Sequence, residues 1–303
     1  MPAADVGSPA GAGARRTLVW IDTLDATDLA LRLTLLTLLL RPVGSPIIRV
    51  GILALAALGL ALPGCLRHLG FWTALAALTA FRVLADWSLA DNHAYLLAYW
   101  CLAVTLALAA REPGACLALN ARLLIGWAFA FAVLWKLALS PDYLDGRFFR
   151  VALLTDERFA DFTRLAGGLD LDQLDALRAF VQGDPAGDGA PMALPGRLVA
   201  IARIATLWTI AIEAAVAFAW LSPVGRGLSV ARDAILIVFC VTTYAIATVA
   251  GFGWLLLSMG VAQCDPRRRR TRLAYLAAFA VVLVYDGLPL MRWVGERLGT
   301  TPQ

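Results

Sequence analysis

Long stretches of this sequence consist almost entirely of apolar residues, and they constrain the possible folds more than any other feature. Only 16% of the residues are charged, whereas 60% are hydrophobic. A helix needs roughly 20 mostly apolar residues to cross the hydrocarbon core of a bilayer, and several stretches approach or exceed that length. The short alternating segments of a membrane barrel do not occur. We therefore predict an all-α fold, a polytopic bundle of transmembrane helices.

The apolar stretches predict about seven to eight spans, judged by the length that a bilayer requires. The first stretch, 28–40, is short and contains Arg32, so it fits either an interfacial helix or part of a first span. The clearer predicted spans are 47–63, 69–89, 93–110, 120–139, 198–222, 231–262 and 272–291.

The sequence predicts one transmembrane domain, 28–291, between two tails. The tail 1–27 is rich in Pro, Gly and Ala and is expected to be flexible, and residues 292–303 form the C-terminal tail. A polar insert, about 140–197, interrupts the apolar stretches. Inside it, Leu171, Leu174, Leu177 and Phe180 predict a short amphipathic helix, which either lies on the membrane surface or caps a cavity.

Charge and cysteine content exclude several classes of function. The net charge of +4 is spread over loops, so we expect the lipid bilayer as a partner and no nucleic acid. The sequence has five cysteines without a CxxC pair and only two histidines. We therefore predict neither a disulfide framework nor a metal site.

Lys136 is the only lysine in the sequence, at the end of the apolar stretch IGWAFAFAVLWKLAL. A desolvated lysine can lose its proton and act as a base near neutral pH, which an arginine cannot do. The alternative is that Lys136 extends its ammonium group to the membrane surface, as many lysines at span ends do. That role would tolerate arginine, which the chain uses everywhere else, so the choice of lysine favours a chemical role.

The hairpin of predicted spans 93–110 and 120–139 places His93 and Lys136 at similar depths on neighbouring helices, with the turn near residue 115. Asp142 is expected near the same membrane face. A simpler interpretation of His93 is that it lies at a helix start, with Asp91 or Asn92 as the N-cap. Asp142 and Asp145 are equally explained as turn residues before Gly146.

Two ionisable residues lie inside other apolar stretches, where a charge costs about 2.5–3.5 kcal/mol on insertion scales. Glu213, in LWTIAIEAAVAFAW, is a candidate buried acid. An interhelical hydrogen bond that stabilises the bundle explains Glu213 equally well. Arg82 needs either an acidic partner or a polar cavity.

Two motifs resemble a known family. DNHAYLLAYW at 91–100 is similar to the asparagine-histidine-small-tyrosine-leucine motif of the vitamin K-dependent γ-carboxylases and their bacterial HTTM relatives. LWKLALSPDYLDG at 134–146 is similar to the lysine-leucine, aspartate-aromatic and glycine motif of the same family. The stretch around Glu213 and GFGWLLLSMG at 251–260 also resemble later parts of the family.

The resemblance implies a carboxylase-like membrane enzyme. In the carboxylases, the motif lysine is taken as the base that deprotonates a reduced quinone, and here the match falls on Lys136. The motif asparagine and histidine fall on Asn92 and His93. Reduced vitamin K or menaquinone would be the cofactor, and a peptide or protein the substrate. The bacterial relatives imply a bacterial cytoplasmic membrane.

Three functional classes stay open at this stage. The first is the quinol-dependent enzyme, with Arg82, Asn92, Asp142 and Glu213 around Lys136 and His93. The second is a non-enzymatic accessory membrane protein, acting in peptide-toxin maturation or immunity, in which the same charges hold helices together. The third is a small transporter with Arg82 and Glu213 along the path.

Overall fold

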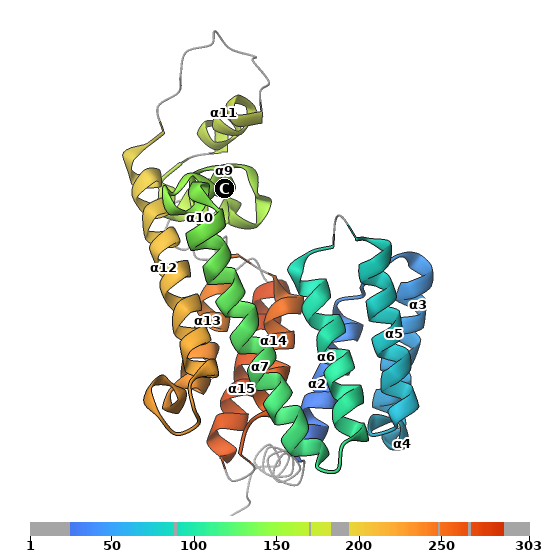
Figure 1. Cartoon of the computed structure of the whole chain (residues 1–303). Helices are drawn as coiled ribbons and strands as arrows, with labels where there is room; N and C mark the ends of the chain where they lie inside the picture. The colour runs from blue at the N-terminus through green and yellow to red at the C-terminus, as the bar shows by residue number, and fades with distance from the viewer. Residues whose placement is uncertain are drawn as a thin grey trace, which may run out of the picture. The chain divides into compact units, whose positions relative to one another are not determined.

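The computed structural model describes residues 25–87, 90–169, 171–182, 194–247, 249–265 and 268–287. Within these ranges the regular elements are helices and no strand occurs, which confirms the predicted all-α class (Figure 1). The predicted tails, 1–27 and 292–303, lie outside the described residues except for 25–27. Most of residues 183–196, in the predicted polar insert, also lie outside them.

Three helices in the described part of the chain are long and apolar enough to span a membrane. They are α6 (Asn92–Ala109), α12 (Gly196–Leu221), and α7 (Pro113–Leu134) together with the π-helical turn η1 (Trp135–Leu139). Shorter apolar helices cover Pro46–Ala61, Leu69–Ala85 and Gly251–Ala262. Helices of this kind are typical of integral membrane proteins. The larger number of seven to eight spans stays a prediction.

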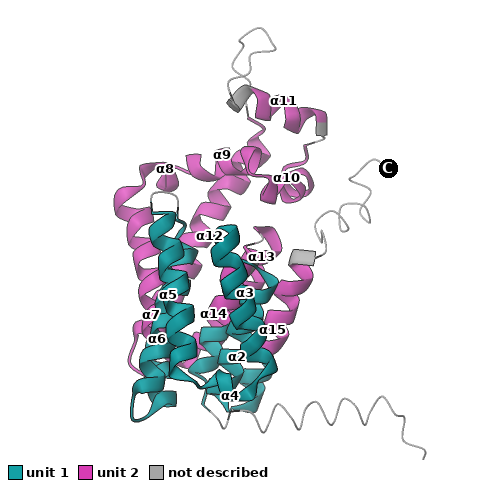
Figure 2. Cartoon of the chain, turned by 90° about the vertical axis from the view of Figure 1, so that its right-hand side faces the viewer, with its two compact units in different colours: residues 1–121, 258–275 teal, residues 122–257, 276–303 magenta. Residues whose placement is uncertain are grey.

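The chain divides into two compact units (Figure 2). The first comprises residues 1–121 and 258–275, and the second comprises 122–257 and 276–303. Three helices contribute residues to both units: α7, α14 (Ala250–Ala262) and α15 (Arg269–Gly287).

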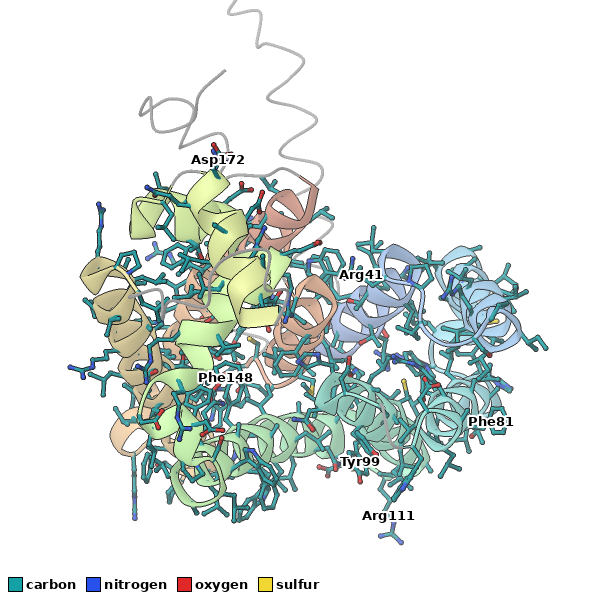
Figure 3. The ribbon with its side chains drawn as sticks, turned by 90° about the horizontal axis from the view of Figure 1, so that it is seen from above. Arg41, Phe81, Tyr99, Arg111, Phe148 and Asp172 are labelled. Carbon is teal, nitrogen blue, oxygen red and sulfur yellow. The ribbon has the colours of Figure 1, made fainter. Side chains whose placement is uncertain are left out.

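The first unit contains α2 to α6, of which α5 packs along α6 and α2 packs against α3. Trp100 of α6 donates its indole hydrogen bond to the Thr34 hydroxyl of α2 at 2.9 Å. At Gly59 of α3, a Cβ atom would lie 2.5 Å from the ring of Phe71, so only glycine permits this close packing. Phe81 and Tyr99 are exposed on α5 and α6 (Figure 3). The remaining bounds are α2 Ala26–Leu40, α3 Pro46–Ala61, α4 Pro63–Leu66 and α5 Leu69–Ala85.

The second unit contains α12, α13 (Arg232–Ile246) and the polar insert. The insert folds into helices that gather where α12 begins (Figures 1 and 2). They bury a small hydrophobic core, including Phe149, Leu153 and Leu174, against Leu198 of α12. The bounds are α8 Pro141–Leu144, α9 Arg147–Thr155, η2 Glu157–Phe159, α10 Ala160–Gly167, α11 Leu171–Gln182 and η3 Gly227–Val230.

The helix α11 confirms the amphipathic helix predicted from the leucine spacing, and Leu174 and Leu177 are its buried residues. The insert also contains α9 and α10, which were not predicted. Their sequences, RFFRVALLT and ADFTRLAG, are short and lie among arginines and aspartates. Their helical form depends on packing against α12, because isolated helices of this length are marginal in water.

The prediction of a single span over 231–262 is wrong. Helix α13 ends at Ile246, Ala247 adopts an extended backbone, and α14 begins at Ala250. The break allows Tyr244 to pack back onto α14, where a Cβ at Gly253 would lie 2.6 Å from the Tyr244 ring. Hydropathy does not reveal this break, because the residues on both sides of it are apolar.

Candidate functional site

Lys136 and Glu213 form an ion pair within the second unit. The Lys136 ammonium lies 2.6 Å from Oε2 of Glu213 and 2.9 Å from Oε1, so it donates to both carboxylate oxygens. The two residues are 77 positions apart in sequence. Their side chains are only 15% and 11% exposed. The pair is therefore a tertiary contact between two apolar helical segments, held largely away from solvent.

Lys136 reaches this position from the inward side of α7. Ile125 and Phe129, four residues apart, are buried on that side. Lys136 follows Phe129 by seven residues, a spacing that keeps both on the same helix face. Phe129 packs edge to face on Phe239 of α13, with ring centroids 4.7 Å apart. Lys136 itself lies in η1, and single π-helical turns within α-helices are frequent at functional sites.

Glu213 lies on the buried side of α12 together with Thr206, which precedes it by seven residues. Thr206 donates its hydroxyl to the carbonyl of Ala202 at 2.9 Å, so that hydroxyl has a partner within its own helix. The opposite side of α12 exposes Ile204 and Trp208. The helix thus presents one polar stripe inward and an apolar surface outward, which fixes the direction of the Glu213 side chain.

Tyr143 of α8 lies next to the Lys136 ammonium. Its ring centroid lies 5.1 Å from the Lys136 ammonium, a cation–π distance. The ring stacks on Phe148 at 4.8 Å and meets Phe149 edge to face at 5.6 Å. The phenol forms a hydrogen bond with Thr209 of α12. Burial, assisted by the negative charge of Glu213, raises the pKa of Tyr143, so the phenol stays neutral.

The arrangement places a proton donor and a proton acceptor side by side in apolar surroundings. A lysine ammonium donates three hydrogen bonds and a carboxylate accepts several, so the pair can hold a hydroxyl group while moving a proton between the partners. Tyr143 covers one side of the ammonium. The chemistry that this set supports is acid–base exchange with a small polar group that enters an apolar site.

The other predicted site residue of the second unit, Asp142, is exposed and forms a different pair. Its carboxylate lies 2.8 Å from Arg147. Asp145 accepts from the backbone N–H of Arg147 at 2.9 Å, directly after the turn at Gly146, whose φ is 77°. The turn interpretation is thus confirmed for Asp145, whereas Asp142 lies in the short helix α8, and its partner is an arginine of α9.

The remaining predicted residues, Arg82, Asn92 and His93, belong to the first unit. Asp91 caps α6 by accepting from the backbone N–H of Ala94 at 2.8 Å, which confirms one of the two predicted N-caps. His93 Nδ1 lies 3.8 Å from Asp91, and Arg82 Nε lies 3.9 Å from Asp86. His93 and Lys136 belong to different units, so their similar depth on neighbouring helices stays a prediction.

Sequence reasoning missed the partner of Glu213 and the roles of Tyr143 and Thr209. Lys136 and Glu213 were separate candidates, because they are 77 positions apart in sequence. One signal was present in the sequence: Thr206, Thr209 and Glu213 recur at helical spacing in an otherwise apolar stretch. Such a stripe indicates an inward face that needs a polar partner.

Among the residues that the structure describes, no group of three or more His, Cys, Asp and Glu side chains is arranged to hold a metal ion. Comparisons of the chain with protein-family models, with curated proteins and with solved structures found no match.

Proposed function

We propose that this chain is an integral membrane protein in which Lys136 and Glu213 act as an acid–base pair on a lipid-soluble weak acid. A reduced quinone of the vitamin K or menaquinone type is the substrate class that the resemblance to the carboxylases implies. The observation that carries the proposal is the contact of the only lysine with both oxygens of a buried glutamate.

The identity of the cation supports proton exchange over a purely structural pair. Arginine matches a carboxylate with two parallel hydrogen bonds and keeps its charge. A site that needed only a permanent ion pair would be well served by arginine, and arginine is the other basic residue of this chain. Lysine differs in that it can release its proton when it is desolvated. The proposal therefore rests on the use of lysine rather than arginine at this pair.

The donor set fits a phenolic hydroxyl group. When bound, a reduced quinone would supply weakly acidic hydroxyl protons. Glu213 would first accept a proton from the Lys136 ammonium, and the neutral amine would then accept the hydroxyl proton of the quinol, while Tyr143 and Thr209 would hold the two segments in place. His93 and Asn92 enter this proposal only through the family resemblance. A carboxylation step and a peptide or protein substrate are likewise implied by the resemblance alone.

The test uses the purified full chain in phosphatidylcholine vesicles with a reduced menaquinone analogue. Wild type is expected to bind the analogue saturably and to shift its ultraviolet spectrum to that of the deprotonated form. Lys136→Arg keeps the charge and is expected to retain binding but lose the spectral shift. Arg147→Lys, at an exposed position, is the matched control and should behave as wild type.

Two results would overturn the proposal. One is the absence of saturable binding above empty vesicles. The other is a Lys136→Arg variant that shifts the spectrum as wild type does, since arginine cannot serve as the base.

The non-enzymatic alternative is favoured by one observation. The pair joins η1 to α12 through two short contacts, 2.6 and 2.9 Å, so it can stabilise the unit without any substrate. In that case Lys136→Arg should retain full stability and full biological activity. The same variant thus separates an accessory protein from an enzyme.

A further inference from the structure

The segment that follows the span ending at Leu139 exposes a row of apolar side chains. Leu144, Phe148 and Val151 are 50%, 47% and 48% exposed. Phe148 and Val151 are three residues apart on α9, which places them on one helix face, and Leu144 ends α8 just before the turn at Gly146. The three residues are called the α9 strip below. Exposed apolar surface of this kind indicates an interaction site when it is contiguous.

The rest of α9 already has its own core. Phe149, Leu153 and Leu154 are buried in the insert, against the start of α12. Helix α9 therefore has two apolar faces, one buried within the second unit and one exposed. Phe148 also stacks on Tyr143, so the α9 strip is rigidly connected to the second unit.

The preceding span also exposes a row of apolar side chains. Trp127, Phe131 and Trp135 are exposed at i, i + 4 and i + 8 of α7 and η1, and the rings of Trp127 and Phe131 stack at 5.6 Å. Outward apolar side chains on a spanning helix face lipid, and tryptophans are enriched at the boundary between lipid and water. The strip begins five residues after the span ends, where the chain reaches that boundary.

The neighbouring helix α11 of the same insert provides a contrast. Its exposed positions are Asp172, Gln173, Asp175 and Ala176, of which Asp172 is labelled with Phe148 in Figure 3. An insert that was covered on all sides by lipid or by another protein would not expose two aspartates there. Among the described side chains of the insert, α11 is therefore polar where α9 is apolar.

The charges around the strip are nearly balanced. Arg147 lies 2.8 Å from Asp142 and 2.6 Å from Asp145, and Arg150 lies 3.9 Å from Asp145. Two arginines thus face two aspartates, and Arg203 of α12, which lies beside Gly146, adds one positive charge. This is far from the cluster of basic residues that anionic lipid headgroups attract. The surface fits the boundary between headgroups and acyl chains, which receives apolar side chains whatever the headgroup charge.

We propose that α8 and α9 form an interfacial anchor, with Leu144, Phe148 and Val151 inserted among the acyl chains of the bilayer that Pro113–Leu139 spans. This inference does not depend on the proposed function, because it concerns the contact of the insert with lipid.

The test places a small fluorescent amino acid by amber suppression at Val151 or, as the matched control, at the exposed Ala176 of α11. This route leaves the five native cysteines unchanged. The full chain is reconstituted in phosphatidylcholine vesicles, with or without phosphatidylglycerol. Lipids that carry a nitroxide at a shallow depth of the bilayer quench the fluorescence of a label in the membrane. Iodide in the buffer quenches the fluorescence of a label in water. Leu144 serves as a second labelling position in case the Val151 variant does not elute as a folded monodisperse protein.

The label at Val151 is expected to be quenched severalfold more by the nitroxide lipid than by iodide, and the label at Ala176 should show the reverse. Both results should be the same with and without phosphatidylglycerol. Equal iodide quenching at Val151 and Ala176 would overturn the anchor. Protection of Val151 from both quenchers would also overturn it, since a protein surface would then cover the strip. A strict requirement for phosphatidylglycerol would contradict the neutral, apolar mode of insertion.

Discussion

The candidate site residues of the two units meet carboxylates in different ways, although the first unit also has a close tertiary pair between Arg67 and Asp28 at 2.6 Å. In the first unit, Arg82 and His93 approach carboxylates four and two residues away, at 3.9 and 3.8 Å, and those aspartates are 49% and 60% exposed. In the second unit, Lys136 meets Glu213 across 77 residues at 2.6 Å. The two aspartates are solvated by water, so these local contacts can be weak even though the Arg82 side chain itself is only 19% exposed. Charges that are largely buried need a close opposite charge, and only tertiary packing supplies it here.

The largest effect is expected from Glu213→Gln, which keeps the size of the side chain but leaves the Lys136 ammonium without a counter-charge. Removing one partner of a buried ion pair typically lowers the free energy of unfolding by about 3–5 kcal/mol. Unfolding in mixed detergent micelles measures this loss. The double variant Lys136→Met with Glu213→Gln should recover most of it, because no unpaired charge is left. A single variant as stable as wild type would show that the pair contributes nothing to the fold.

A smaller loss is expected from Tyr143→Leu, which keeps an apolar side chain but removes the ring between Lys136 and the two phenylalanines. Each aromatic pair is worth about 0.5–1.5 kcal/mol beyond its buried area, so two pairs predict a loss of about 1–3 kcal/mol. Tyr143→Phe is the control, because it keeps the rings and loses only the hydrogen bond with Thr209. If both variants lose the same stability, the hydroxyl rather than the ring holds the insert in place.

For the local contacts of the first unit, Asp91→Ala is expected to lower stability by about 1 kcal/mol, the usual effect of removing an N-cap. The lost contact is the 2.8 Å hydrogen bond from Ala94. Asp91→Asn should retain most of the stability, since its side-chain oxygen accepts the same bond. The same unfolding assay measures both variants, and a loss as large as that of Glu213→Gln would contradict the distinction between the two units.

The smallest effect concerns the Asp156 pair in the insert and depends on pH. Hydrogen bonds from Arg158 lower the pKa of Asp156 below its ordinary value. The folded state therefore gains stability from the ionised carboxylate above about pH 4, the ordinary range of an aspartate. That stability is lost as the pH falls through the lowered pKa of the folded state. Asp156→Asn should flatten the acid side of the stability–pH curve, and an unchanged curve would show that this pair is not coupled to folding.

The sequence predicted the helical class and the approximate positions of the long apolar helices, because hydropathy is a local property. It also predicted α11 and the Asp91 cap, which depend on residues within one or two turns. It did not predict the break between α13 and α14, because both sides of that break are apolar. Nor did it predict α9, which is amphipathic but only nine residues long, so its helical form depends on the core that it packs against.

By itself, the sequence determined that Lys136 and Glu213 lie in apolar helical stretches, where each charge is costly and requires a partner. The tertiary structure decided that they are partners of each other, because the long Lys136 side chain of η1 reaches the carboxylate of Glu213 on α12. It also brought Tyr143 and Thr209 to the same site. The physical reason is that solvation cost is a property of each residue and its surroundings along the chain, whereas the choice of a counter-charge depends on which helix faces meet in space.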